Sequence, residues 1–174
     1  MQFKLVSILA LAGFAAAAPS STQDFKNLPD GPYSGINNAD GSSSVTHMET
    51  GETFNFAAPA KRSLEKRDTH CWGYELDHGG VDAAVVQLKN WAGTGRDWKS
   101  DGTPSYFGYN ERGVYVYYCI NAPRSQGNLD VADINYALGQ MDSKCKRYEA
   151  GYFRWDGSVE IVGKTRSGDN ICLG

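Results

Sequence analysis

The chain has 174 residues, with 17 Lys and Arg against 20 Asp and Glu and a formal net charge of −3. Its positive charges are neither in excess nor gathered in one stretch. This excludes the basic surface that is typical of nucleic-acid-binding proteins, so we expect no nucleic-acid partner.

The first residues have the layout of a secretory signal peptide. Lys4 supplies a positive charge, residues 5–18 are apolar except for Ser7 and Gly13, and the run ends in small residues before Pro19. A charged part, an apolar part and a small-residue cleavage site define such signals. The run is also shorter than the roughly 20 residues that a membrane-spanning helix needs. We therefore predict a signal peptide at residues 1–17, a secreted, extracellular protein and no stable membrane insertion.

The next segment, residues 18–67, is predicted to be a pro-segment. Its first half is rich in Ser, Gly, Asn, Asp and Pro and has few aliphatic residues, so it is expected to be largely disordered. Residues 45–56 alternate loosely between apolar and polar, and a short hairpin around Thr50-Gly51 is compatible with that pattern.

Two Lys-Arg pairs, Lys61-Arg62 and Lys66-Arg67, close this segment. They are either a solvated basic patch or sites at which a protease cuts the chain. All four cysteines, all four tryptophans and most tyrosines follow Arg67. Because the composition changes so sharply there, we predict that the pairs are processing sites and that residues 68–174 form the mature domain.

The four cysteines are Cys71, Cys119, Cys145 and Cys172. An even number of cysteines in a secreted chain predicts two disulfides, with three possible pairings. No C-x-x-C pair occurs, and the nearby histidines are only His70 and His78, so we expect no metal site and no cofactor.

Residues 68–174 predict an alternation of strands and helices. β-Branched and aromatic residues indicate strands at 71–76, 105–110, 114–121, 148–155 and 158–163. Apolar residues at helical spacing indicate one helix at 81–92, and a second from an Asn128 N-cap to about residue 144.

This order, β-α-β-β-α-β-β, predicts an α+β fold. We expect a split β-α-β, ferredoxin-like sandwich, in which two helices cover one face of an antiparallel sheet. With the usual strand order, the first and third strands are neighbours, which favours Cys71–Cys119. The end of the second helix would then meet the end of the last strand, which favours Cys145–Cys172.

The other face of such a sheet would carry aromatic side chains. If alternate residues of 114–120 point to the core, then Tyr115 and Tyr117 point away from it. Together with Trp155 they form a candidate binding face. One interpretation is cross-strand packing that stabilises the sheet. The other is a platform for an extracellular protein, a glycan, a membrane target or a second copy of the chain, as in a homodimer.

No constellation of catalytic residues is apparent, and we predict that the protein is not an enzyme. A secreted ribonuclease would need a His or Glu base and a cation for the phosphate, and Glu75, His78 and Arg112 could serve. Their spacing gives no support to this assignment, so His78 is interpreted as a solvated turn residue.

The layout resembles that of fungal small secreted proteins: a signal peptide, a short pro-segment, a dibasic cut and a compact cysteine-containing domain. Lys61-Arg62 and Lys66-Arg67 resemble kexin-type sites, which are cut after the arginine. In the order of its elements, the mature part is similar to α/β-sandwich fungal killer toxins and to necrosis-inducing effectors, although such toxins usually carry more cysteines. The resemblance implies a non-enzymatic effector or elicitor that binds a host or competitor target, with a killer-type toxin or a small nuclease as alternatives.

Overall fold

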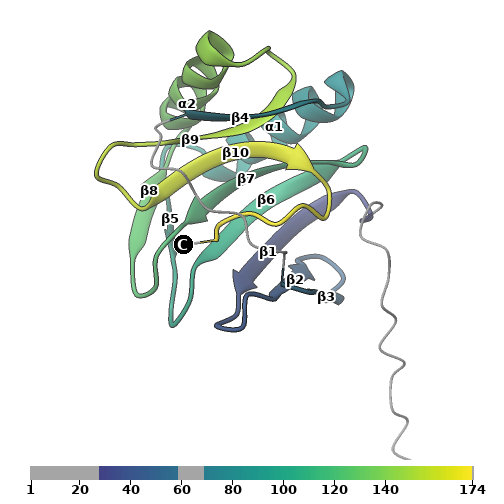
Figure 1. The fold of residues 1–174 in the computed structure, drawn as a ribbon, viewed down its shortest axis with the longest axis vertical. Coiled ribbons are helices and arrows are strands. Elements are labelled where there is room, and N and C mark those ends of the chain that lie inside the picture. The colour runs from purple at the N-terminus through teal and green to yellow at the C-terminus, as the bar shows by residue number, and fades with distance from the viewer. Residues whose placement is uncertain (1–27, 59–68, 174) are drawn as a thin grey trace, which may run out of the picture.

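The computed structural model of the chain describes residues 28–58 and 69–173 (Figure 1). The predicted signal peptide and both Lys-Arg pairs, with Lys61, Arg62, Lys66 and Arg67, lie outside these residues. Signal cleavage and processing at the dibasic sites therefore stay predictions.

The main sheet has eight strands in the order β3-β2-β1-β6-β7-β10-β9-β4, and all of its pairings are antiparallel. The bounds of its strands are β1 (Gly31–Asn37), β2 (Ser43–His47), β3 (Thr53–Phe56), β4 (Thr69–Glu75), β6 (Ser105–Glu111), β7 (Val114–Ile120), β9 (Glu149–Arg154) and β10 (Glu160–Arg166). A separate pair consists of β5 (Arg96–Lys99) and β8 (Gln126–Leu129), and the helices are α1 (His78–Ala92) and α2 (Val131–Lys144). The predicted α+β class is confirmed.

Both helices begin at an aspartate whose carboxylate accepts a hydrogen bond from the first turn. The Asp77 side chain accepts from the Gly80 amide at 2.7 Å, and Asp130 accepts from the Asp133 amide at 2.8 Å. The Asp133 carboxylate in turn accepts a hydrogen bond from the Asp130 amide, which completes a capping box. The predicted N-cap Asn128 is wrong: this residue lies in β8, two residues before the N-cap Asp130, and its side chain donates a hydrogen bond to Asp97.

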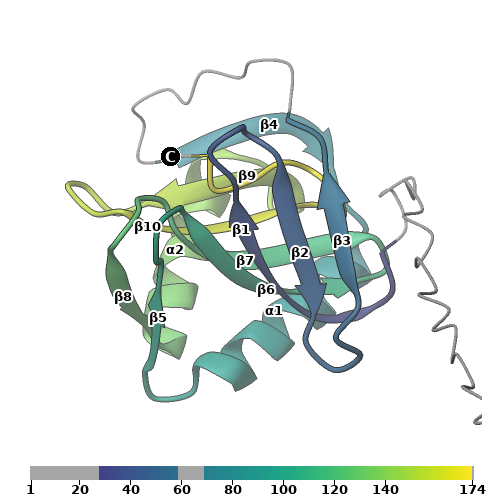
Figure 2. The ribbon, with the colours of Figure 1, turned by 90° about the horizontal axis from the view of Figure 1, so that it is seen from below.

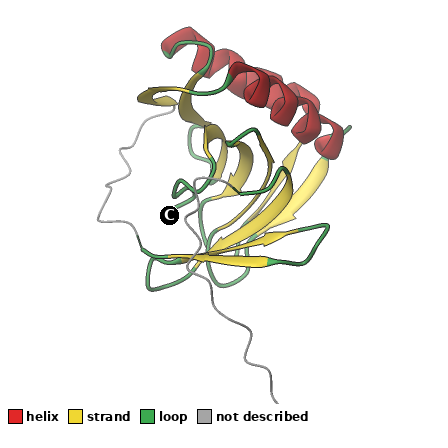
Figure 3. Ribbon diagram, turned by 90° about the vertical axis from the view of Figure 1, so that its right-hand side faces the viewer, coloured by secondary structure: helices red, strands yellow, loops and turns green. Residues whose placement is uncertain are grey.

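The helices and the sheet share one apolar core. It contains Leu88 of α1 and Met141 of α2, together with Val116, Tyr118 and Val162 of β7 and β10. Figure 3 shows the two helices on the same side of a strongly curved sheet.

The concave side of the sheet holds a second core. Strands β1–β3 contribute Tyr33, Val45, Phe54 and Phe56, which alternate with exposed or half-buried residues in the period-2 pattern of a sheet with one buried face. The C-terminal segment returns into this core through Ile171 and Cys172. Figure 2 shows how the N-terminal strands lie across the rest of the molecule.

Residues 28–58 are therefore part of the domain, which corrects the prediction that the pro-segment is largely disordered. The compatible hairpin around Thr50-Gly51 is present as β2–β3. The alternation of Val45, Phe54 and Phe56 did not suffice to predict ordered strands, because these short strands depend on distant partners. They pair with β6 through β1, and their apolar side chains are buried in the concave core.

The strand order differs from the predicted split β-α-β sandwich. The first strand of residues 69–173, β4, lies at the sheet edge beside β9, whereas the prediction placed it next to β7. Strands β5 and β8 were also missed. Of the two described helices, neither combines the length and apolar character needed to span a bilayer.

Two disulfides are formed, but the favoured pairing is wrong. The bonds are Cys71–Cys145 and Cys119–Cys172, with Cα atoms 5.7 and 5.8 Å apart. Because β4 lies at the edge near the end of α2, Cys71 meets Cys145, the C-cap of that helix. Cys119 points into the concave core, where Cys172 arrives with the C-terminal segment.

Candidate functional site

The predicted binding face does not exist as one surface. Tyr115 and Tyr117 are only 6% and 1% exposed and belong to the concave core. Trp155 is half-buried against the helix-side core, with its ring 5.0 Å from that of Phe153. The prediction failed because strands β1–β3 and the C-terminal segment cover the face that was expected to be open.

These tyrosines stabilise the interior. The Tyr115 hydroxyl donates to the carbonyl of Tyr33 at 3.1 Å, and burial raises the pKa of both Tyr115 and Tyr117. A cavity beside Tyr106 and Tyr115 measures about 20 Å³, which is room for about one water molecule. We therefore assign a structural role to the part of this core that the described residues form.

An open groove lies on the opposite, convex side of β1 and β2. It measures about 380 Å³ and runs between these strands and the segment that follows β5. Its floor carries hydroxyl groups and one exposed aliphatic side chain, Ile36, which is 45% exposed. The hydroxyl-bearing residues that line it are Ser34, Ser44, Thr46, Thr103 and Ser105. We call this site the outer groove.

One wall of the outer groove is Trp98 of β5, followed by the exposed Lys99. Trp98 is held by neighbouring rings: the Trp91 ring lies at 6.0 Å edge-on, and the Phe107 ring at 5.5 Å. Asp101 adds a carboxylate to the same wall. An aromatic wall facing hydroxyls and single charges is a lining that combines apolar contact with directed hydrogen bonds.

A second candidate site lies where β4 enters α1. The His78 Nε2 lies 2.6 Å from Glu75 Oε1, and the imidazole stacks on the Tyr148 ring at 3.8 Å. Both members of the pair are exposed. A space of about 480 Å³ opens here, lined by Glu75, Tyr148 and Lys146 among others. We call this site the α1 corner.

Arg112, the third residue of the predicted ribonuclease set, reaches the α1 corner from the β6–β7 turn. Its guanidinium lies against Gly79, so close that a Cβ at Gly79 would be 2.6 Å from Nη1. The structure thus brings Glu75, His78 and Arg112 to one end of α1, although sequence spacing gave no reason to group them.

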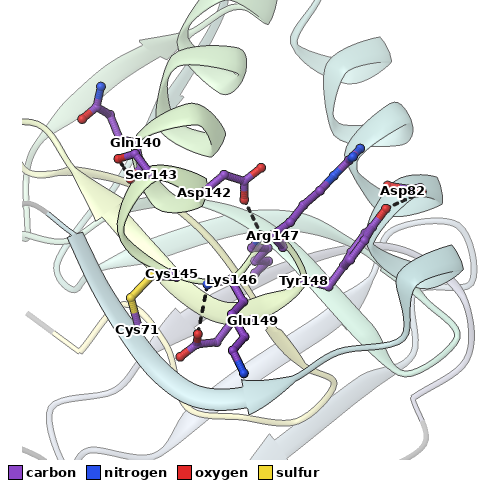
Figure 4. Close-up of polar contacts among 11 residues, drawn as sticks. Cys71, Asp82, Gln140, Asp142, Ser143, Cys145, Lys146, Arg147, Tyr148 and Glu149 are labelled. Carbon is purple, nitrogen blue, oxygen red and sulfur yellow. Dashed lines mark hydrogen bonds and ion pairs between the residues drawn. A yellow bond between two sulfur atoms is a disulfide. The ribbon is translucent and has the colours of Figure 1, made fainter.

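The α1 corner is braced by groups that are already paired. The Glu149 carboxylate accepts from the amides of Gly73 (2.8 Å) and Lys146 (3.1 Å), next to the Cys71–Cys145 disulfide (Figure 4). Tyr148 points toward Asp82 and donates to it at 3.3 Å (Figure 4). Glu149 therefore fixes the loop before β9 and is not available as a free base.

Among residues 28–58 and 69–173, no group of three or more His, Cys, Asp or Glu side chains is placed to hold a metal ion. The outer groove escaped sequence reasoning because half of it comes from the segment that was expected to be disordered. The alternation of Ser34, Ile36, Ser44 and Thr46 with buried neighbours was the available signal.

No protein-family model, curated protein or solved structure matches the chain.

Proposed function

We propose that the protein is a secreted, non-enzymatic effector or elicitor that binds a glycan of a host or competitor cell surface in the outer groove. The observation that carries this proposal is the lining of the groove. Sugar rings present both C–H faces and hydroxyls, and the groove offers Trp98 and Ile36 beside the hydroxyls of Ser34, Ser44 and Thr46.

Secretion fits the same proposal. Two disulfides close long loops, with sequence separations of 74 and 53 residues, and disulfides of this kind persist in oxidising compartments. A rigid sheet beneath the groove keeps its polar groups in place, so little order has to be gained when a ligand binds.

Binding is tested with the purified protein against soluble chitin, β-glucan and mannan fragments. Ile36→Ser is expected to weaken binding about tenfold or more, because it removes the aliphatic contact from the floor. Met48→Ser is the matched control, since Met48 is 52% exposed but does not line the groove. Equal affinity in both variants would contradict the assignment of the groove.

The biological class is tested by infiltrating the same protein into plant tissue, with the reduced and alkylated form as control. A response to the native form alone supports an elicitor. Growth inhibition of fungal lawns without a plant response would instead favour the killer-type toxin.

A second function, phosphodiester cleavage of RNA at the α1 corner, is favoured by the contact of Glu75 with His78 and the approach of Arg112. A carboxylate–imidazole pair can move a proton, and a guanidinium at the same end of the helix can hold a phosphate. An RNA-degradation assay would show activity that His78→Ala abolishes and His70→Ala retains. RNA that stays intact with the unaltered protein would exclude this function.

A further inference from the structure

Strand β1 is joined to the rest of the domain by a continuous backbone ladder. It pairs antiparallel with β6 from Gly31 opposite Asn110 to Ile36 opposite Ser105. Strands β2 and β3 then extend the sheet from β1. The segment 28–58 thus occupies the edge that β6 would otherwise present.

The same segment fills the concave core with apolar side chains. Tyr33 is 0% exposed, and its ring lies 6.5 Å from that of Tyr115. Leu28, Val45, Phe54 and Phe56 are also buried in that core. These side chains cover Tyr106, Tyr115 and Ile171, which belong to residues 69–173. Removing the segment would open this core to water.

Polar anchors hold both ends of β1. The buried Asn110 side chain donates to the carbonyls of Leu28 at 2.7 Å and Pro29 at 3.0 Å. At the other end, the buried Asn37 side chain donates to the carbonyls of Ile171, at 2.9 Å, and Cys172. Buried amides that lost these partners would leave unpaired polar groups on both sides.

We propose that residues 28–58 are a permanent constituent of the active molecule, and that they stay bound without a covalent link when the chain is cut before β4. The first cysteine in the sequence is Cys71, and both disulfides join residues of the later part, so no disulfide tethers the segment. The product of such a cut is one sheet built from two chains. This inference goes beyond the proposed function and does not depend on it.

The test uses the full chain with residues 61–67 replaced by the recognition sequence of a specific protease, so that cutting is assured. After cutting under native conditions, both fragments are expected to co-elute in size-exclusion chromatography at the volume of the uncut chain. In denaturant, without reduction, they are expected to separate.

Two variants sharpen the result. Tyr33→Ala removes the most buried anchor of the segment, so the cut variant is expected to lose its N-terminal fragment on the column. Met48→Ala, an exposed change in the same segment, is expected to retain it. An N-terminal fragment that leaves the unaltered cut protein, whether the remainder stays folded or aggregates, would overturn the proposal.

Processing in the cell is a separate measurement. Intact-mass and N-terminal analysis of the secreted protein shows whether the chain is cut at the dibasic pairs. Whether or not it is, the engineered cut tests if the N-terminal fragment stays bound. A single uncut secreted chain would contradict the processing prediction alone.

Discussion

Lys164 carries a charge into the core between α2 and the sheet. It is 1% exposed, and its ammonium donates to Asp142 Oδ1 at 3.2 Å and to the Arg147 carbonyl. These two acceptors come from α2 and from the turn that follows it. The side chain therefore ties this end of the helix layer to β10 by a charge-assisted contact, which is stronger than a neutral hydrogen bond.

Asp142→Ala is expected to lower the free energy of unfolding by about 1–3 kcal/mol, because it leaves the buried ammonium with one acceptor fewer. Lys164→Met removes the charge itself and keeps most of the volume, so it is expected to be less harmful. Urea denaturation of the two variants compares them directly. An Asp142→Ala protein as stable as the parent would show that the pair contributes nothing.

Tyr33 of the concave core and Tyr74, which packs against the helix-side core, make the protein sensitive to alkali. Burial raises the pKa of Tyr33 and, together with a hydrogen bond to Asp169, that of Tyr74, each to about 12. In the unfolded chain a tyrosine titrates near about 10. The unfolded state therefore loses these protons first. The stability that the neutral phenols contribute is complete below about pH 10 and is lost as the pH rises through about 12.

The free energy of unfolding is thus expected to fall between about pH 10 and about pH 12, with buried phenolate absorbance appearing only as the protein unfolds. Tyr33→Phe should have a shallower decline, because it removes one of the raised groups. A decline of equal slope in the variant would show that Tyr33 does not contribute. Urea titrations at fixed ionic strength supply the measurement.

At the scale of elements, glycines in one strand make room for tyrosines of the next. A Cβ built on Gly35 would lie 2.2 Å from the Tyr106 ring, and one on Gly163 would lie 2.4 Å from that of Tyr117. Tyr115 crosses Gly108 in the same way. Rings lying flat over glycines let the sheet curve while its concave face stays filled.

Gly163→Ala is therefore expected to destabilise the protein by about 1–3 kcal/mol, as overpacking of a core does. Gly139→Ala is the matched control on the exposed face of α2, where no heavy atom approaches the new Cβ. There the loss of glycine flexibility should stabilise by roughly 0.5–1 kcal/mol. Thermal unfolding of both variants measures these stability changes. Changes of the same sign in the two variants would contradict the close packing at Gly163.

The helices and most strands of residues 69–173 could be predicted from the sequence, but which strands pair with one another could not. Helical spacing indicated α1 and α2, and the β-branched and aromatic run indicated β7, because these signals are local. The pairing of β4 with β9 and of β1 with β6 depends on contacts between distant residues, which no local pattern encodes. Glu75, His78 and Arg112 were named together in the sequence analysis, but their spacing could not predict that they meet at one end of α1, because Arg112 arrives there from the β6–β7 turn.

For the whole molecule, the two disulfides connect the layers in different ways. Cys71–Cys145 joins the edge strand β4 to the end of α2, and Cys119–Cys172 fixes the C-terminal segment inside the curve of the sheet. Both close long loops, and the chain-entropy account assigns roughly 4 kcal/mol to loops of this length. The sequence predicted that two disulfides form, but the pairing followed from a strand order that the chain does not adopt.

Peptide mapping without reduction is expected to recover Cys71 linked to Cys145 and Cys119 linked to Cys172. Replacing both cysteines of either pair by Ala should lower the free energy of unfolding by about 2–4 kcal/mol, since the unfolded chain regains freedom. Recovery of Cys71 linked to Cys119 would contradict the fold at its edge strand.

The hydrogen bonds from Asn37 to Ile171 and Cys172 also have a consequence for biosynthesis. The partners are separated by 134 and 135 positions, so the ribosome must make nearly the whole domain before β1 can be anchored at that end. Domains generally fold as units during or after synthesis. Here the concave core cannot form stepwise from the N-terminus, because it needs residues from both ends of the domain. The nascent chain must therefore keep Tyr33 and its neighbours soluble until residue 172 has been synthesised.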